Sequence, residues 1–405
     1  MSKELKKIIY YLVNWGSSSG KHFLGEVTYD EQGVQNVETL LSIAAERLNT
    51  VGSVVKAKDG EGNLLFTAAK DNMNPAEAAE LGFKAIMQIM PLSNVSLVIN
   101  RAVTMGTKFM DTCWLTEETE SAMEQYSDRA PEHNPVALGS IRLTKEWMPE
   151  ARQVLVPDSN VHTTIPKVAY TYAIMKEWTE QFALRKMGFH GSVIANAIRE
   201  LSEQVKPTQC IIAHLGNGCS ITAVKDGKVM DTSMGLTPLT GTVMGTRAGD
   251  VDPSMLPILA KELDVSVEEV LRLLNKKCGL LGLSGLGSDF RDLLEASEQG
   301  HEGAKLAVEV FLYRTCLEIS KYQAPIAGMR QLVFSGGIGE NSSYVRERIC
   351  DNFAYLGLKL DKEKNAGRYS SIAKISAEDS HVDVFVIPAD EMTEMIRQAV
   401  GLLNK

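Results

Sequence analysis

Short runs of apolar residues, each ending in a turn rich in glycine, asparagine or serine, recur along the chain. The first run, residues 8–13, enters the turn 14–21, and a second run, residues 211–215, enters the turn Gly216-Asn217-Gly218. Each pattern is typical of a buried strand followed by a hairpin. A second strand is predicted after each turn, at residues 21–27 and 219–224. The two halves of the chain therefore begin alike, which indicates an internal duplication.

The turns admit two interpretations. Glycines on both sides of Asn217 leave backbone N–H groups open to an anion, so the turn could handle phosphate. An ordinary antiparallel hairpin that turns back at Asp226-Gly227 has the same pattern. The first turn is not a P-loop, because only three residues separate Gly16 from Gly20 and His22 follows Lys21 where that motif requires serine or threonine.

Capping residues and apolar spacing predict helices between the strands. Asn74-Pro75 has the pattern of an N-cap followed by a proline in the first helical position, and it opens a predicted helix to Met90. A strand is predicted at 95–100, so Arg101 stands at its carboxyl end, where open α/β sheets bind ligands. A solvated arginine is the ordinary alternative.

The remaining chain continues the alternation. Irregular loops are predicted over 128–165, around a short strand at 153–156, and one helix over 166–185 that ends in the turn 188–191. The segment Gly336–Asn341 is predicted to be a turn between a strand and a helix, suited either to a nucleotide's phosphates or to simple chain reversal. Other elements are predicted as helices at 264–275, 303–324 and after Asp390, and as a strand at 382–387.

Composition narrows the class of protein. A chain of 405 residues predicts two domains with a cleft between them. The net charge of −9 argues against a general nucleic-acid binder. The six cysteines form no Cys-x-x-Cys pair, so we expect neither a zinc site nor a disulfide framework. We therefore expect the protein to be located in a reducing cytoplasm. No segment has the length of a membrane span, and the apolar start is too short for a signal peptide.

Six segments together resemble the acetate kinase family and its short-chain acyl kinase relatives, within the wider superfamily of sugar kinases, Hsp70 and actin. They match in order and separation and lie at residues 14–21, 133–135, 188–191, 214–252, 288–292 and 336–342. The resemblance implies an α/β, two-domain duplicated, actin-like (ribonuclease H-like) ATPase fold with an interdomain cleft. It implies an N-terminal acyl-kinase domain at 1–160 plus 391–405, and a nucleotide-binding domain at 161–390. A cytoplasmic homodimer is also implied.

The resemblance further implies reversible transfer of the ATP γ-phosphoryl group to acetate or another short-chain carboxylate, giving an acyl phosphate and ADP, with Mg²⁺ or Mn²⁺. A carboxylate is already ionised at neutral pH, so the obstacle is repulsion between two anions, which cations and fixed donors relieve. The motifs assign catalysis to Arg101, Asp158, His190 and Arg247, and metal binding to Asn14 and Glu391.

Two further residue sets follow from the same resemblance. The nucleotide and phosphate set comprises Asn14, Ser17, Ser19, Lys21, His214, Asn217, Gly218, Asp289, Phe290, Arg291, Gly337, Ile338, Gly339 and Glu340. The substrate pocket set comprises Val103, Glu132, His133, Phe189 and Pro238. For each residue a structural role is the alternative: a surface ion pair for the arginines, a helix cap for Glu391, a structural histidine for His133, His190 and His214.

The sequence also departs from the family. Relatives usually read His-Arg-Val-Val-His-Gly-Gly around the first arginine, whereas here both histidines are replaced, by Asn100 and Thr104. Glu132 and Ile194 stand where relatives have leucine and histidine, and Trp15 is large for its position. Glu132 either selects a polar substrate or turns to solvent. The acceptor is therefore acetate, propionate, butyrate or a polar carboxylate.

Two other functions remain open. One is an ATP-binding module of the same fold with weakened catalysis, which would need fewer of the five residues Arg101, Asp158, His190, Arg247 and Glu391. The other is a sugar kinase with Asp158 as general base, although a pair of arginines suits an anionic acceptor better than a neutral hydroxyl.

Overall fold

The computed structural model describes residues 4–16, 19–130 and 133–404. The chain divides into two compact units, Met1–Asn160 with Glu391–Lys405 and Val161–Asp390, called unit 1 and unit 2 below. Unit 1 contains the strands β1 Lys6–Trp15, β2 Gly20–Asp30, β3 Gly33–Glu46, β4 Val54–Asp59, β5 Leu64–Ala69, β6 Leu97–Ala102, β7 Cys113–Trp114 and β8 Arg152–Pro157. Its helices are α1 Pro75–Met87, α2 Glu117–Gln125, α3 Asn134–Trp147 and α15 Glu391–Leu403.

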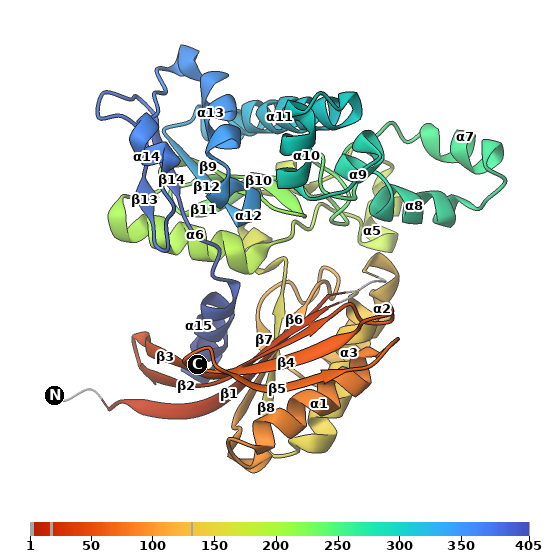
Figure 1. Cartoon of the computed structure of the whole chain (residues 1–405), viewed down its shortest axis with the longest axis vertical. Coiled ribbons are helices and arrows are strands. Elements are labelled where there is room, and N and C mark those ends of the chain that lie inside the picture. Colours follow the sequence, from red (N-terminus) through yellow and green to blue (C-terminus); the bar gives the residue numbers. More distant parts are fainter. Residues whose placement is uncertain (1–3, 17–18, 131–132, 405) are drawn as a thin grey trace. The chain divides into compact units, whose positions relative to one another are not determined.

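Unit 2 contains a smaller sheet and most of the helices (Figure 1). Its strands are β9 Gln209–Leu215, β10 Cys219–Lys225, β11 Lys228–Thr232, β12 Gln331–Ser335, β13 Ala373–Lys374 and β14 Asp383–Val386. Its helices are α4 Lys167–Tyr170, α5 Lys176–Phe182, α6 Gly191–Gln204, α7 Met255–Glu262, α8 Val267–Lys276, α9 Gly279–Ser284, α10 Phe290–Glu298, α11 Glu302–Tyr322, α12 Gly336–Asn341, α13 Ser343–Asp351 and α14 Lys362–Ala366.

The two sheets share one connectivity, and this confirms the predicted duplication. In unit 1 the order β3-β2-β1-β6-β8-β7 combines two antiparallel pairs, two parallel pairs and a final antiparallel pair. Unit 2 repeats this pattern as β11-β10-β9-β12-β14-β13. In each sheet three neighbouring parallel strands therefore end at one edge, which is where an open α/β sheet presents its ligand-binding residues.

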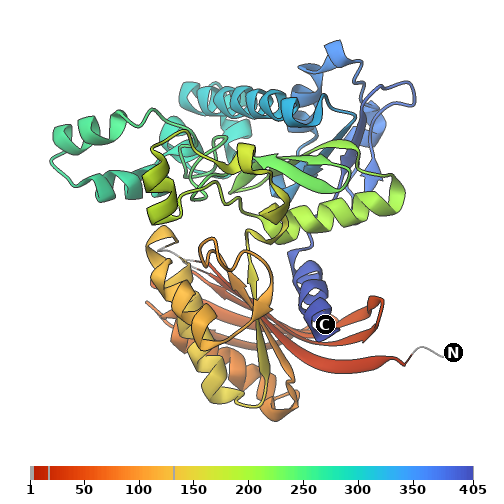
Figure 2. The same cartoon turned by 180° about the vertical axis from the view of Figure 1, so that it is seen from behind.

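Alternation along the strands builds a core on both faces of each sheet. In β1, Tyr11 and Val13 pack with Phe83 and Ile86 of α1, whereas Tyr10 and Leu12 face the opposite side and pack with α15. In unit 2, α6 packs its apolar face on β9, and α11 contacts β9 and β10. Figures 1 and 2 show α6 and α11 on opposite sides of this sheet. No helix among the described residues combines the length and apolarity needed to cross a bilayer.

Local signals located several elements correctly. Asn74 caps α1, because its side chain accepts a hydrogen bond from the backbone N–H of Glu77, whose carboxylate accepts in turn from the Asn74 N–H. Arg101 lies one residue before the end of β6, close to the predicted strand end.

Three predictions about elements were wrong. The predicted loops over 128–165 contain α3, whose Pro135 occupies the first turn, where a missing N–H costs nothing. The predicted helix over 166–185 is interrupted between α4 and α5, where the Tyr172 hydroxyl accepts a hydrogen bond of 2.8 Å from the Leu236 N–H. That contact from a distant segment overrides the local preference. The turn predicted over 188–191 leads into α6, which begins at Gly191.

The third error concerns Gly336–Asn341, which is a short helix, α12, and not a turn. Hydrogen bonds at both ends of this segment stabilise the helix, which its glycines alone would disfavour. The carboxylate of Glu340 accepts from the N–H groups of Gly336 and Ala389 at 2.8 and 3.0 Å. At the other end, the buried Arg346 guanidinium donates to the carbonyls of Gly339 and Glu340 at 3.0 and 2.7 Å. These bonds satisfy groups that a helix terminus leaves free.

Candidate functional site

Arg101 is the centre of a polar network at the edge of the unit 1 sheet. The three parallel strands β1, β6 and β8 end there, and they bring Asn14, Arg101 and Asp158 together although 57 residues separate the last two. Both oxygens of Asp158 accept from the guanidinium, from Nε at 2.7 Å and from Nη2 at 2.6 Å. This two-point fork fixes the plane of the guanidinium.

Asn14 and Glu391 complete this network. Arg101 Nη1 donates to Asn14 Oδ1 at 3.2 Å, and Asn14 Nδ2 donates to Glu391 Oε2 at 2.9 Å. The other oxygen of Glu391 lies 3.5 Å from Arg101 Nε. Asn14 thus links the arginine to the carboxylate at the start of α15, a helix that returns to unit 1 from the end of the chain.

Burial and charge act in opposite directions on these groups. Burial alone would lower the pKa of Arg101, but the carboxylates of Asp158 and Glu391 hold it above its usual value, so the guanidinium stays charged. Burial raises the pKa of Glu391, and the charge of Asp158 adds to this, while Arg101 and Asn14 oppose it. Glu391 is therefore a carboxylate that gains from a further cation nearby.

The β1–β2 hairpin carries the predicted phosphate residues of unit 1. Asn14 pairs with Lys21 across the hairpin, and both Lys21 and Ser19 are exposed. Trp15 is buried instead, because its ring occupies the space beside Gly20 where a Cβ atom would lie only 2.4 Å away. Ser17 lies outside the described residues.

Two of the predicted pocket residues of unit 1, Val103 and His133, lie on chain segments that are hydrogen-bonded to each other. Val103 is buried after the end of β6, and His133 precedes α3. The Asn134 side chain joins the two segments, because its Nδ2 donates to the Thr104 carbonyl at 2.8 Å. Glu132 lies outside the described residues, so its direction toward or away from the pocket stays a prediction.

In unit 2, the loop Gly216–Gly218 gathers His190, His214 and Arg247. A Cβ atom on Gly218 would lie 3.2 Å from His190 Nε2 and 3.7 Å from Arg247 Nη1, so a glycine allows these two side chains to approach the loop. The ring centroids of His190 and His214 are 4.7 Å apart.

His190 occupies an unusual backbone position. Its φ of 61° is left-handed, a region that non-glycine residues rarely adopt and that is over-represented at functional sites. Its Nδ1 lies 3.0 Å from Ser220 Oγ, which orients the ring and leaves Nε2 near Gly218. Burial lowers the pKa of His214 to about 4, so that ring is neutral at pH 7.

Arg247 lies two residues after Gly245, which makes a second close contact with the loop Gly216–Gly218. The Gly245 N–H donates to the Asn217 carbonyl at 2.9 Å, and a Cβ on Gly245 would collide with the Asn217 side chain. Arg247 Nη1 donates to the Pro238 carbonyl at 3.0 Å, which joins a predicted catalytic residue to a predicted pocket residue. Phe189 is buried, and its carbonyl lies 2.8 Å from Nε2 of His162.

A cavity of about 890 Å³ opens in unit 2 between the loop at 216–218, α10, α12 and the start of α13. Asp289, Phe290, Arg291, Gly337 and Ile338 line it, together with Gly216 and Asn217. This volume is in the range of about 300–1,000 Å³ that small-molecule sites occupy. Six of the fourteen residues predicted to bind the nucleotide or its phosphates therefore line one cavity of unit 2: Asn217, Asp289, Phe290, Arg291, Gly337 and Ile338.

Within that set the side chains have different partners. Asp289 caps α10 and accepts from Arg291 through both oxygens, at 3.1 and 2.7 Å, while Arg291 is largely exposed. Phe290 is mostly buried against Phe311. Glu340 stabilises α12, and neither it nor Gly339 lines the cavity.

Sequence reasoning missed several lining residues. Leu294, Glu295, Tyr344 and Arg368 border the cavity, and all four lie outside the segments that resemble the family. The spacing of α10 could have indicated Leu294 and Glu295, because they lie one turn after Phe290 and Arg291. No local pattern marks Arg368.

Comparisons with known proteins cover almost the whole chain. The model of the Acetokinase family matches residues 9–398. The acetate kinase of Clostridium botulinum (strain Okra / Type B1) is 40% identical over 404 residues, covering 97% of this chain and 99% of that protein. The acetate kinase of Agathobacter rectalis is 39% identical over 402 residues, with the same coverage.

Two solved structures are similar throughout their length. A propionate kinase from Francisella tularensis subsp. tularensis SCHU S4 has a TM-score of 0.87 and 33% identity, covering 98% of this chain and 99% of that chain. The acetate kinase of Porphyromonas gingivalis has a TM-score of 0.85 and 32% identity, covering 98% and 100%.

Proposed function

The chain belongs to the acetokinase family, and from this premise we propose how its residues transfer a phosphoryl group. It is an acetate kinase-like short-chain acyl kinase, a phosphotransferase with a carboxyl group as acceptor. The proposed reaction moves the γ-phosphoryl group of ATP reversibly to acetate or another short-chain carboxylate, and gives an acyl phosphate and ADP. The proposed homodimer and the residue roles below are inferences from this premise.

The observation that carries the proposed mechanism is the fork between Arg101 and Asp158. Three N–H groups of the guanidinium bind Asp158 and Asn14, and its remaining N–H groups are available to an acceptor carboxylate or a phosphoryl oxygen. A preoriented cation is what the reaction needs, because negative charge spreads over the oxygens during transfer. No general base is required, since the acceptor is already ionised.

Residues of unit 2 are proposed to hold the transferring group. His190 presents Nε2 and Arg247 presents its guanidinium beside Gly218, so both can donate to phosphoryl oxygens at the same loop. Asp158 is a positioning residue for Arg101 in this scheme, and Ser220 and Pro238 position His190 and Arg247.

Two oxygen-bearing side chains of unit 1 suit a magnesium ion. Mg²⁺ keeps several waters and takes one or two carboxylates together with phosphates, so a three-ligand protein cluster is not required. None of the described residues forms such a cluster of three acids, histidines or cysteines. The proposed ligands are the Glu391 carboxylate, whose raised pKa indicates that it gains from a cation, and Asn14 Oδ1, which also accepts from Arg101 Nη1 at 3.2 Å. The ion, when bound, would neutralise charge on the phosphates.

The cavity in unit 2 is proposed to hold the nucleotide. Ile338 and Phe290 supply apolar surface for a base, and the glycine-flanked loop at Asn217 supplies backbone N–H groups for phosphates. Unit 2 then acts as the nucleotide-binding domain and unit 1 as the acyl-kinase domain.

The acceptor is proposed to be acetate, with propionate next. Acetate kinases and a propionate kinase are all similar to this chain over almost its whole length. The proposed pocket residues are Val103, His133, Phe189 and Pro238. Glu132, one of the residues that depart from the family pattern, would favour a polar carboxylate if it enters the pocket.

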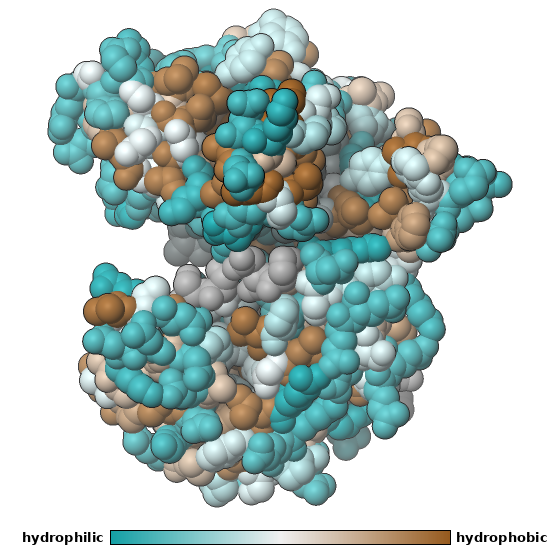
Figure 3. Space-filling view, turned by 90° about the vertical axis from the view of Figure 1, so that its right-hand side faces the viewer, coloured by the Kyte–Doolittle hydropathy of each residue, from teal (hydrophilic) through white to brown (hydrophobic). Residues whose placement is uncertain are grey.

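A homodimer is proposed from the family, and exposed apolar side chains of unit 2 support it. Val168, Ile174, Met175, Trp178 and Phe182 are all exposed. Hydrophobic groups, brown in Figure 3, are visible on the surface of unit 2. Grouped exposed apolar residues are typical of an interface. Light scattering of the purified protein at micromolar concentration should give twice the chain mass of 44.4 kDa, and the mass of one chain at every concentration would exclude the dimer.

Hydroxylamine trapping tests the reaction. The purified protein is incubated with ATP, Mg²⁺, hydroxylamine and one carboxylate at a time from acetate, propionate, butyrate and succinate. We expect an acyl hydroxamate with acetate or propionate and none without ATP. If no carboxylate gives a product while the protein still binds ATP, the protein is instead a binding module of this fold.

A further inference from the structure

Glu340 joins the nucleotide cavity of unit 2 to the chain segment that leads into α15. It belongs to α12, which lines the cavity through Gly337 and Ile338, whereas the Glu340 side chain does not line it. One oxygen of this half-buried carboxylate, Oε1, accepts from two backbone N–H groups, that of Gly336 at 2.8 Å and that of Ala389 at 3.0 Å. The same oxygen therefore holds the start of α12 and the segment after β14.

The chain leaves unit 2 through residues 387–389, just before α15 and Glu391. All three residues are hydrogen-bonded within unit 2: the Ile387 N–H to the Phe334 carbonyl at 2.9 Å, the Pro388 carbonyl to Asn196 Nδ2 at 3.2 Å, and the Ala389 N–H to Glu340. The proline also fixes one backbone angle of the segment. Glu340 thus holds the chain only two residues before Glu391, the proposed metal ligand.

Arg346 gives α12 a second, independent support. Its guanidinium is 1% exposed and donates to the carbonyls of Gly339 and Glu340 at 3.0 and 2.7 Å. Its other hydrogen-bond partner among the described residues is Asn365, so Arg346 does not reach the segment 387–389. The two supports differ in this respect, and variants of each can separate the state of the cavity wall from its link to the exit segment.

We propose that Glu340 is a positioning residue, which links the α12 wall of the nucleotide cavity to the segment that presents Glu391 to the metal ion. The inference rests on the proposed function, in which Glu391 and the nucleotide's phosphates share Mg²⁺. A nucleotide packed against α12 fixes the Glu340 carboxylate, which in turn fixes Ala389. Hydrogen bonds to an ionised oxygen suit this role because they are stronger than those between neutral groups. Coupling between two sites typically changes an affinity by about 5- to 150-fold.

Calorimetric titration with ADP measures this link without catalysis. Each protein is titrated once in EDTA, which removes divalent cations, and once in Mg²⁺. The ratio of the two dissociation constants is the gain in ADP affinity that Mg²⁺ provides, called the magnesium gain below. Glu391→Gln should lower the magnesium gain, and the decrease measures the part that depends on the Glu391 carboxylate.

Two variants of Glu340 test whether it acts through Glu391. Glu340→Ala should lower the magnesium gain about tenfold, close to the effect of Glu391→Gln, because both hydrogen bonds of Oε1 are lost. Glu340→Gln should keep most of the magnesium gain, because an amide oxygen has two lone pairs and can accept both bonds. A purely structural role of the side chain would not produce a change confined to the magnesium gain.

Arg346→Lys provides the opposite result. It should weaken ADP binding in EDTA about tenfold, because α12 loses hydrogen bonds, and keep the magnesium gain, because the bond to Ala389 remains. Asp59→Ala is the matched control for Glu340→Ala. One oxygen of Asp59 also accepts from two backbone N–H groups, at 3.0 and 2.8 Å, but lies in unit 1 away from the proposed site.

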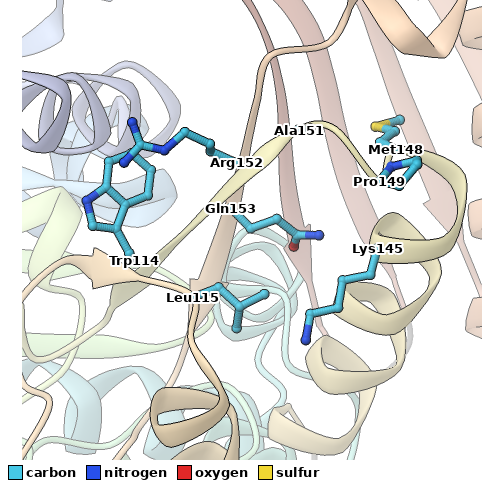
Figure 4. A pocket seen from close by; sticks show the side chains of 8 residues that line it. All are labelled: Trp114, Leu115, Lys145, Met148, Pro149, Ala151, Arg152 and Gln153. Atoms are coloured by element: carbon cyan, nitrogen blue, oxygen red, sulfur yellow. The ribbon is translucent and has the colours of Figure 1, made fainter.

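Arg152→Lys is the matched control for Arg346→Lys. The Arg152 guanidinium lies over the Trp114 ring, 3.6 Å from its centroid, beside a pocket of about 370 Å³ in unit 1. Gln153, the next residue in β8, points to the opposite face of the sheet (Figure 4). Neither side chain belongs to the proposed site, so both control variants should keep the two dissociation constants of the unchanged protein.

Three results would overturn the proposal. These are an unchanged magnesium gain in folded Glu340→Ala, an equal loss of the gain in Arg346→Lys, and an unchanged gain in Glu391→Gln. Circular dichroism shows which variants are folded. If Glu340→Ala is not, Glu340→Asp replaces it, and its shorter side chain should lower the gain about threefold. A protein that shows this pattern but forms no acyl hydroxamate would refute the proposed reaction and leave the link intact.

Discussion

Replacing Asp158 by asparagine removes the charge that holds Arg101 in place while preserving size. Asp158 and Arg101 have side chains only 7% and 19% exposed, so solvent cannot replace the lost partner. The asparagine can still accept from one nitrogen of the guanidinium, but its NH₂ group then faces the other nitrogen, which is also a donor. Arg101 would turn toward Glu391, 3.5 Å away, and leave its present plane.

The cost can be estimated from this geometry. Removing one partner of a buried ion pair typically destabilises a protein by about 3–5 kcal/mol. Because Asn14 and Glu391 still contact Arg101, we expect the lower end, about 3 kcal/mol. A reorientation of the guanidinium by about 1 Å should lower kcat about 100-fold.

The assay pairs urea unfolding with hydroxamate formation, and Asp231→Asn is the matched control. Asp231 also forms a largely buried ion pair, with Lys186. The two side chains are 17% and 15% exposed, and Asp231 has no part in the proposed site. The control should lose stability but keep kcat within about twofold, since no proposed catalytic group changes position. If Asp158→Asn kept normal kcat, Arg101 would not depend on this carboxylate, and the proposed mechanism would be wrong.

Two further predictions concern buried histidines and the glycine loop. Burial lowers the pKa of His22 to about 3 and those of His162 and His214 to about 4, so the unfolded chain binds more protons between pH 4 and 6.5, and stability is lost as the pH is lowered through that range. Unit 1, with one such histidine, should lose about 2 kcal/mol between pH 7 and pH 5 in urea unfolding, and unit 2, with two, about 4 kcal/mol; equal stability at both pH values would contradict the burial argument. Gly218→Ala should lower kcat about tenfold, because the added Cβ would lie 3.2 Å from His190 Nε2. Gly139→Ala is the control and should keep the normal kcat, because there is open space around Gly139. Equal kcat values in the two variants would exclude the loop Gly216–Gly218 from the site.

Local chemistry made some elements predictable from the sequence. Asn74-Pro75 predicted the start of α1 because a capping box depends on neighbours within one turn. The two hairpins were predictable for the same reason, and their resemblance indicated the duplication that the sheet order confirms. The end of a predicted strand already indicated Arg101, whereas the catalytic role of Arg101 and the choice of Asp158 came from the family resemblance.

Interactions between distant segments were not predictable locally. The helix α12 depends on Arg346, and the interruption after α4 depends on a bond from Tyr172 to Leu236. The cavity residue Arg368 is distant in sequence from Phe290. In each case the partner comes from another element, which local propensity does not include.

Arg247→Ala tests the central claim most directly, that fixed guanidinium groups lower the barrier to transfer between two anions. ATP affinity is measured by calorimetry and turnover by hydroxamate formation on the same preparation. We predict ATP binding within about threefold of the unchanged protein and a loss of roughly 10³-fold in kcat, since the cation stabilises charge that develops during transfer. Near-normal turnover with intact ATP binding would contradict the claim.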